Sequence, residues 1–175
     1  MRDNWATKAT ASTWQKKDQY YEKTGHNQES LAYILNSNFQ SYCEVGSGTG
    51  RIINQLRGRR GAIDINPHLL KLLNNDIKKY NLNIAKKTIP DRYELVYSYQ
   101  VMQHLDHDEF VKALEHIRQI ATREIWLLEG YIAKKEDGEM THKTGSYFHR
   151  INDYINCYQI DSLDDGRVLA YRAKV

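Results

Sequence analysis

The stretch that decides the fold is Cys43-Glu44-Val45-Gly46-Ser47-Gly48-Thr49-Gly50. Its first part, together with residues 41–42, is short and apolar and predicts a buried strand. The glycines that follow at every second position let a backbone pass close to a ligand. Residues 51–56 carry apolar side chains at a spacing that predicts a helix, whose first N–H groups would face an anion. The stretch therefore predicts a strand–turn–helix unit with a ligand at the turn.

A second predicted strand, 61–65, contains an acid at its carboxyl end, Asp64. In a βαβ unit the carboxyl ends of successive parallel strands are neighbours, so we expect Asp64 beside the glycines. A carboxylate in that place can accept hydrogen bonds from the two hydroxyls of a ribose. A dinucleotide fingerprint needs glycine at the sixth position counted from Gly46, and this chain has Arg51 there. A nucleoside-containing cofactor of another class is therefore expected.

Strand-like and helix-like segments alternate from residue 41 to residue 129, which predicts βαβ units, a mostly parallel sheet and helices on both of its faces. Two further strand-like runs are joined by Asp164-Asp165-Gly166, a sequence typical of a hairpin turn. The expected strands are 41–46, 61–65, 82–85, 93–98, 124–128, 158–163 and 167–174, and the expected helices are 14–21, 28–37, 51–56, one from Pro67, 106–122 and 151–155.

Length and composition favour one domain in an intracellular setting. The chain has 175 residues, with 41% hydrophobic residues and a mean hydropathy of −0.73. We expect a single domain over 1–175, no transmembrane helix, no secretory signal and a cytoplasmic location. Two cysteines, Cys43 and Cys157, are too few for a disulfide scaffold or a dedicated zinc site. Because the net charge is only +3 and the basic residues are scattered, nucleic acid is an alternative partner that composition does not favour.

In Glu44, Gly46, Gly48 and Gly50 the chain resembles the class I S-adenosylmethionine-dependent methyltransferases, whose first motif is an acid, any residue, then Gly-x-Gly-x-Gly. The resemblance extends over about residues 28–175. It implies a Rossmann-like three-layer α/β sandwich, with a mostly parallel sheet of seven (or six) strands and a C-terminal antiparallel hairpin. It also implies S-adenosyl-L-methionine as cofactor and S-adenosyl-L-homocysteine as product, with cofactor contacts from Glu44, Gly46, Ser47, Gly48, Gly50, Asp64, Ile65, Tyr99 and Gln100.

The chain departs from that family in three places. The third motif normally supplies an acid near the adenine, and residues 83–88 contain none, so we expect either a backbone group or a looser adenine site. Glu94 replaces the usual Asp of the fourth motif. The Asn-Pro-Pro-Tyr or Asp-Pro-Pro-Tyr motif of enzymes that methylate DNA base amines is absent, and that activity is not expected.

Methyl transfer is an in-line displacement that depends on positioning, and a hydroxyl or ammonium acceptor also needs a base. Our candidates for catalytic residues are His104, Glu129 and His149, which the predicted topology brings to the carboxyl ends of strands or to the later loop. Each has a structural alternative. His104 could pack beside the helix that follows it, Glu129 could simply end a strand, and His149 could start a surface helix.

Two segments remain for substrate recognition. Residues 1–27 contain Trp14, Tyr20 and Tyr21, and we expect a lid over the cofactor that includes Tyr21, or else a helix packed on the sheet edge. Residues 131–148 are expected to form an acceptor-side loop. Because only these two short segments remain for substrate recognition, we expect the acceptor to be a small molecule or a biosynthetic intermediate. The alternatives are an RNA or protein methyltransferase, a non-catalytic cofactor-binding regulatory module, or a lyase using the same cofactor. The sequence predicts no metal and leaves the oligomeric state open.

Overall fold

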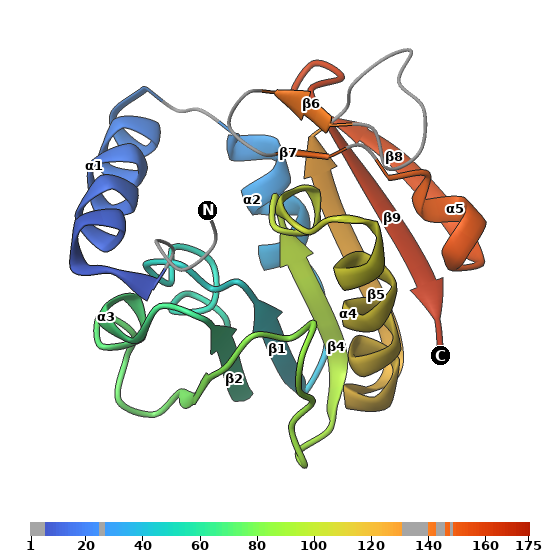
Figure 1. The fold of residues 1–175 in the computed structure, drawn as a ribbon, viewed down its shortest axis with the longest axis horizontal. Coiled ribbons are helices and arrows are strands. Elements are labelled where there is room, and N and C mark those ends of the chain that lie inside the picture. The colour runs from blue at the N-terminus through green and yellow to red at the C-terminus, as the bar shows by residue number, and fades with distance from the viewer. Residues whose placement is uncertain (1–5, 25–26, 131–139, 143–145, 148) are drawn as a thin grey trace.

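A computed structural model describes residues 6–24, 27–130, 140–142, 146–147 and 149–175 of the chain. The chain forms a seven-stranded sheet in the order β3-β2-β1-β4-β5-β9-β8 (Figure 1). The strands are β1 (Ser41–Val45), β2 (Arg59–Asp64), β3 (Lys78–Asn81), β4 (Tyr93–Tyr99), β5 (Ala121–Gly130), β8 (Cys157–Leu163) and β9 (Val168–Lys174).

Neighbouring strands from β3 to β5 pair in parallel, and β9 is antiparallel to both β5 and β8. The hairpin turn at Asp164 and Asp165, which both have positive φ angles, connects β8 to β9. The sheet therefore confirms the predicted fold, a mostly parallel α/β sandwich of seven strands that ends in an antiparallel hairpin. Within the described residues, no helix is long and apolar enough to cross a membrane.

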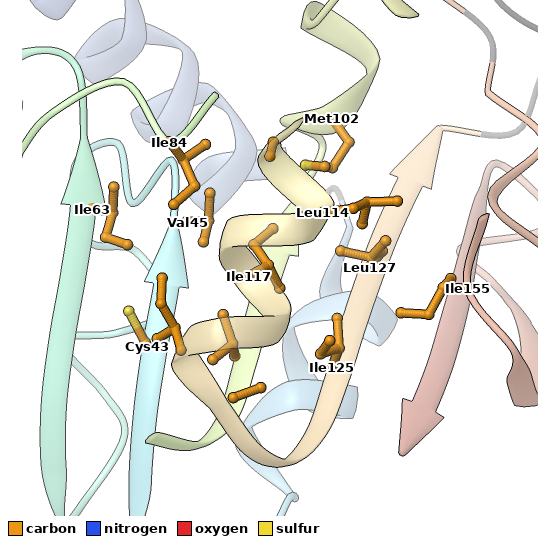
Figure 2. Close-up of a cluster of buried hydrophobic side chains, with 14 of the residues drawn as sticks. Cys43, Val45, Ile63, Ile84, Met102, Leu114, Ile117, Ile125, Leu127 and Ile155 are labelled. Carbon is orange, nitrogen blue, oxygen red and sulfur yellow. The ribbon is translucent and has the colours of Figure 1, made fainter. Parts of the chain in front are cut away.

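Helices cover both faces of the sheet, as Figure 1 shows with α4 in front and α2 behind. On one face α4 (His107–Ile120) packs Leu114 and Ile117 against Ile125, Leu127 and their neighbours (Figure 2). The opposite face packs on α2 (Gln28–Leu35) and on the chain between β1 and β2. The remaining elements are α1 (Lys8–Thr24), α3 (Pro67–Leu70), the 3-10 turn η2 (Met102–His104), α5 (Ile151–Tyr154), and the two-stranded sheet of β6 (Met140–His142) and β7 (Ser146–Tyr147).

The helix predicted at 51–56 is wrong, because these residues form a series of turns. The carbonyls of Ile53 and Asn54 accept hydrogen bonds from Arg60 Nη1, both at 3.2 Å. The N–H of Gln55 donates to the carbonyl of Ile52, three residues back, at 2.9 Å. These bonds hold the turns in place of a regular helix. The chain still buries Ile52, Ile53 and Leu56 in the core, which accounts for the apolar spacing that suggested a helix. The expected helix N-terminus behind the glycines is consequently not part of the site.

The third strand also differs from the prediction. It comprises Lys78–Asn81 rather than 82–85, and it pairs with β2 from Gly61 to Asp64. β3 is an edge strand with a polar, partly exposed sequence, so it lacks the hydrophobic signal of a buried strand. Nearer the N-terminus, the helix expected at 14–21 is longer, from Lys8 to Thr24.

Candidate cofactor-binding site

A cavity of about 210 Å³ opens beyond the carboxyl ends of β1, β2 and β4, the position at which open α/β sheets bind ligands. The glycine turn 46–50 forms its base, and residues 64–66, 82–84 and 99–101 contribute from the neighbouring strand ends. Helix α1 closes another side with Trp14, Asp18 and Tyr21. Tyr21 of the predicted lid segment lines the cavity, whereas residues 1–5 and 25–26 of that segment lie outside the described residues.

The glycine turn has a shape that side chains would disturb. Gly46 and Gly48 have φ angles of +69° and +54°, a region that favours glycine. A Cβ atom on Gly46 would overlap the Val101 side chain, whereas one on Gly48 would meet no atom within 4 Å. Gly48 therefore faces open cavity, and its missing side chain leaves room for a ligand against the backbone. Ser47 also lines the cavity.

Asp64 links the second strand to the glycine turn. Its carboxylate accepts hydrogen bonds from the backbone N–H groups of Gly48 and Asn66, both at 2.8 Å. Burial raises the pKa of this carboxyl, and the two N–H donors counteract the increase. Each carboxylate oxygen has a further lone pair that can accept a hydroxyl hydrogen. Asp64 therefore has the position and the chemistry expected for a ribose contact.

Glu44 lines the cavity, but its carboxylate is hydrogen-bonded to the backbone that follows the glycine turn. It is buried, and its Oε2 accepts a hydrogen bond from the N–H of Ile53 at 3.2 Å. Burial raises the pKa of Glu44 to about 8, so this carboxyl is largely protonated at neutral pH. Glu44 thus stabilises the turns that replace the predicted helix, and it contributes to the site by fixing the chain after the glycines.

The part of the cavity that follows β3 contains a residue whose position the sequence did not predict. Leu82, Asn83 and Ile84 follow β3 directly and line the cavity together with Ile65. The Asn83 Oδ1 accepts a hydrogen bond from the N–H of Ala85 at 2.9 Å, which fixes the turn. An amide follows the third strand, where the resemblance led us to expect an acid, and an amide group carries both a donor and an acceptor. The sequence did not indicate this position of Asn83 because the third strand was predicted four residues too late, which placed Asn83 within the strand instead of after it.

Tyr99 and Gln100 also line the cavity, and their place beneath the sulfonium stays a prediction. Gln100 has a φ angle of +54°, and its N–H donates to the carbonyl of Leu128 at 2.7 Å. This left-handed residue turns the chain sharply after β4. The turn directs Val101 against the glycines and leads into η2.

Of the three candidate catalytic residues, His104 is the one that lines this cavity. It ends η2, and burial lowers the pKa of its imidazole to about 4, with a smaller contribution from the charge of Lys17. The imidazole is therefore neutral near pH 7 and is in the form that can accept a proton.

Glu129 occupies a different position. Its carboxylate accepts hydrogen bonds from the Ser98 hydroxyl at 3.0 Å and from the backbone N–H groups of Met102 and Gln103 at 3.1 and 3.3 Å. Burial raises the pKa of Glu129 to about 7 despite these donors. Glu129 thus holds the start of η2 and lines a second, smaller cavity, and it is not among the residues that line the cavity at the glycine turn. Its catalytic role stays a prediction.

His149 likewise lies beside the second cavity, together with Tyr147. Its ring stacks on Phe110 with a centroid separation of 4.1 Å, and its Nε2 is 2.9 Å from the carbonyl oxygen of Leu105. The structure therefore does not bring His149 together with His104 and the glycine turn. Most of the predicted acceptor-side loop 131–148 lies outside the described residues. Among the described residues, no group of three or more potential ligands could hold a metal.

Two charged residues at the cavity were also missed. Arg51 follows the glycine turn, and Asp18 accepts a hydrogen bond from the hydroxyl of Thr49 within that turn. Trp14, Asp18 and Tyr21 are separated by four and three residues, which places them on one face of a helix. That spacing is a signal from which the sequence could have predicted Asp18.

Comparison with known proteins agrees with this geometry. A family model described as a methyltransferase domain matches residues 43–127, which include the glycine turn, Asp64 and η2. The curated proteins contain no match to the chain. Among solved structures, the chain is similar to DhpI in its complex with S-adenosylhomocysteine, with a TM-score of 0.72, 16% identity, and coverage of 94% of this chain and 90% of that chain.

Two further structures are similar over nearly their whole lengths. Magnesium protoporphyrin IX methyltransferase (ChlM) from Synechocystis PCC 6803 with bound S-adenosylmethionine has a TM-score of 0.68 and 13% identity, covering 99% of this chain and 94% of that chain. An S-adenosylmethionine-dependent methyltransferase from Aquifex aeolicus has a TM-score of 0.71 and 12% identity, with 94% and 98% covered. At these identities the structures establish the fold.

The fold and the site define a Rossmann-like methyltransferase. With the family match across the glycine motif, the chain belongs to the class I S-adenosylmethionine-dependent methyltransferases, enzymes whose cofactor is S-adenosylmethionine. This confirms the family, the enzyme class and the cofactor expected from the sequence.

Proposed function

We propose that this enzyme transfers a methyl group from S-adenosylmethionine to a small molecule or biosynthetic intermediate. The observation that carries the proposal is the cavity at the glycine turn, which combines an open backbone at Gly48, the Asp64 carboxylate and the His104 imidazole. When bound, S-adenosylmethionine supplies an electrophilic methyl carbon on a positively charged sulfur.

The chain's own residues have distinct tasks in this proposal. Gly46 to Gly50 admit the cofactor against the backbone, Asp64 accepts hydrogen bonds from the ribose, and Asn83 faces the adenine edge. Glu129 fixes η2 through backbone N–H groups, and η2 in turn presents His104. The neutral imidazole of His104 can accept a proton from a hydroxyl or ammonium acceptor, while α1 limits the access of water.

A small acceptor fits the dimensions of the molecule. The cavity must hold both the cofactor and the reacting end of the acceptor, and α1 already covers one side of it. Structurally similar proteins include the N-methyltransferase NodS from Bradyrhizobium japonicum WM9 and the mitomycin 7-O-methyltransferase MmcR, whose names specify transfer to nitrogen and to oxygen. These likenesses support the reaction type and do not select the acceptor atom.

The test is calorimetric titration with S-adenosylmethionine and S-adenosylhomocysteine, followed by a search for the acceptor. Radiolabelled S-adenosylmethionine and the enzyme are incubated with cell extract separated into small-molecule, RNA and protein fractions. We expect both cofactor forms to bind and the label to enter the small-molecule fraction. Label in RNA or protein would overturn the proposed acceptor class, and the absence of cofactor binding would overturn the proposal as a whole.

A further inference from the structure

Lys17 holds an ammonium group at the side of the cavity that α1 closes. Trp14, Lys17 and Tyr21 are separated by three and four residues, which places them on one face of the helix. Both aromatic residues line the cavity. The Lys17 Nζ lies 4.4 Å from the centroid of the Trp14 ring and 5.5 Å from that of the Tyr21 ring. These two cation–π contacts hold the charge of Lys17 at the rim of the cavity.

The contacts of Lys17 leave its charge without a counter-ion. Among the residues that the structure describes, no carboxylate forms an ion pair or a hydrogen bond with its ammonium group. The side chain is half-buried, so water reaches only part of it. An ammonium has three N–H donors, and the two ring contacts offer them no oxygen acceptor. An anion at the rim would supply both the charge and the acceptors.

The same cation acts on the candidate base. His104 lines the cavity, and the charge of Lys17 contributes to its lowered pKa, after the larger effect of burial. The cavity therefore has a proton acceptor in η2 and a cation on α1 that is near enough to influence it. An acceptor that reaches His104 with its nucleophilic atom passes close to Lys17.

The charge of α1 also favours an anion. The helix carries four lysines against one aspartate and one glutamate. The aspartate, Asp18, already accepts a hydrogen bond from the hydroxyl of Thr49. The excess of positive charge on the helix that closes the cavity attracts anions over longer distances.

We propose that the methyl acceptor is an anionic small molecule, and that Lys17 binds its carboxylate or phosphate oxygens while His104 faces the nucleophilic atom. Carboxylates and phosphates share the chemistry that an ammonium recognises, a negative charge on oxygen atoms that accept hydrogen bonds. The inference rests on the proposed function and narrows it. It assigns a charge to the acceptor, and it makes Lys17 a specificity-determining residue on α1.

Ion exchange before the reaction tests the charge of the acceptor. Small-molecule extract is divided at pH 8 into anionic, neutral and cationic fractions, and each is incubated with the enzyme and radiolabelled S-adenosylmethionine. We expect the anionic fraction to take up the label. Phosphatase treatment of that fraction before the reaction distinguishes the two anions, because it abolishes labelling of a phosphate-dependent acceptor and leaves that of a carboxylate.

A variant of Lys17 tests the residue. Lys17→Met keeps an unbranched apolar side chain against the two rings and removes the charge. In a dilution series of the anionic fraction, we expect its apparent KM to rise about 10-fold, the lower end for a hydrogen bond to a charged group, with kcat within about twofold. Assays at pH 8 keep His104 neutral in every variant. Lys17→Arg retains the charge and should have a lower KM than Lys17→Met.

The controls separate this contact from the overall charge of α1. Lys16→Met and Lys23→Met remove exposed cations of the same helix and should keep the KM of the unmodified enzyme. All variants should bind S-adenosylhomocysteine with an unchanged Kd, which shows that α1 and the cofactor site are intact. A structural role of Lys17 alone would weaken S-adenosylhomocysteine binding or leave KM unchanged, and either result would overturn its role as the anion contact.

The fractions also separate this inference from the function on which it rests. Label in the neutral or cationic fraction would overturn the anionic acceptor and leave the small-molecule methyltransferase intact; a cationic acceptor would direct attention to carboxylates at the cavity such as Glu109. Label in none of the three fractions would overturn the proposed small-molecule acceptor itself, and the inference with it.

Discussion

Gly48 is the residue at which backbone conformation and ligand space coincide. Its φ angle of +54° strains any other residue, and a Cβ there would project into the cavity without meeting protein atoms. We expect Gly48→Val to weaken S-adenosylhomocysteine binding at least 100-fold in calorimetry, because the valine side chain fills ligand space. The cost in unfolding free energy should be modest, on the order of 1–2 kcal/mol from backbone strain.

Gly166 provides the control for that experiment. It has a φ angle of +80° in the β8–β9 turn, and a Cβ there would approach only the Ser162 hydroxyl, at 3.7 Å. Gly166→Val should therefore lose a similar amount of stability and keep its cofactor affinity. If both variants bound S-adenosylhomocysteine equally well, the glycine turn would not be the cofactor site.

Glu44 links pH to stability through its burial. Its pKa is about 8 in the folded chain against 4.5 for an ordinary glutamate. Between these values the folded state binds more protons than the unfolded state, so the stability that this group contributes falls as the pH rises. A glutamine in its place keeps an acceptor for the Ile53 N–H and does not titrate. We therefore expect urea unfolding to show Glu44→Gln gaining stability relative to the unmodified chain from pH 5 to pH 8, by at most about 1.4 kcal/mol per pH unit. Glu115→Gln, on the exposed side of α4, should show no such trend; an identical trend in both variants would contradict the assignment.

His104 can be tested separately from cofactor binding. With the acceptor identified by the labelling screen, we expect His104→Gln to lower kcat about 100-fold, the lower range of general base catalysis, and to leave the S-adenosylhomocysteine Kd within about threefold. The rate of the unmodified enzyme should also fall as the pH drops toward 4, where the imidazole takes up a proton. His107→Gln, at the start of α4 and outside the cavity lining, is the matched control. An unchanged kcat in His104→Gln would exclude His104 as the base.

At the scale of elements, α1 is attached to the site by a few polar contacts. Asp18 meets Thr49, and the Asn66 side chain donates to the carbonyl of Thr7 at 3.0 Å. Figure 1 shows α1 beside α3, separate from the main sheet. We expect Thr49→Val to accelerate amide hydrogen exchange across α1 about fivefold while the amides of β1 and β4 stay protected, since one hydrogen bond is worth about 1 kcal/mol. Thr13→Val removes a hydroxyl that bonds within α1 to Ala9, and it serves as the control. Faster exchange in β4 as well would show that α1 and the sheet open together.

The elements that the sequence predicted well are those whose burial is simple. β1 and β4 are buried on both faces, and α4 has a continuous apolar stripe, so their hydrophobic patterns are unambiguous. The chain from Arg51 to Leu56 has the same apolar character, but its turns are held by hydrogen bonds to the Glu44 carboxylate and from the Arg60 guanidinium, which no local pattern records. β3 was predicted at the wrong residues for the opposite reason, the absence of an apolar pattern. Its Lys78-Lys79 start lacks apolar residues, and the strand forms because β2 offers it a free edge.

The site residues likewise divide into those that a local sequence motif predicts and those whose positions depend on tertiary contacts. The glycines and Asp64 could be predicted, because a motif fixes their spacing and the strand order then brings them together. The helical spacing of Asp18 with Trp14 and Tyr21 could have placed it on one face of α1, but its position at the cavity depends on where α1 docks. The position of Asn83 depends on where β3 ends. Glu129 was placed correctly at a strand end, yet its hydrogen bonds to η2 are a tertiary feature that the sequence does not encode locally.

At the scale of the whole molecule, the cavity is assembled from segments that lie far apart in the sequence. Trp14 on α1, Gly48 after β1, Asn83 after β3 and His104 in η2 all line it. A ligand that contacts all four segments binds the folded chain and not the unfolded one. Its binding free energy is therefore added to the stability of the entire domain.

That coupling predicts the thermal response of the molecule. At a concentration 100 times its Kd, S-adenosylhomocysteine should add about 2.7 kcal/mol, which for a domain of this size raises Tm by about 5–10 °C. Scanning calorimetry should show a single transition that moves upward as a unit with the logarithm of ligand concentration. Gly48→Val should show almost no shift over the same range, while Gly166→Val should shift as the unmodified chain does. A transition that splits, with only one part responding to the ligand, would mean that the cavity is formed by fewer segments than the structure brings together.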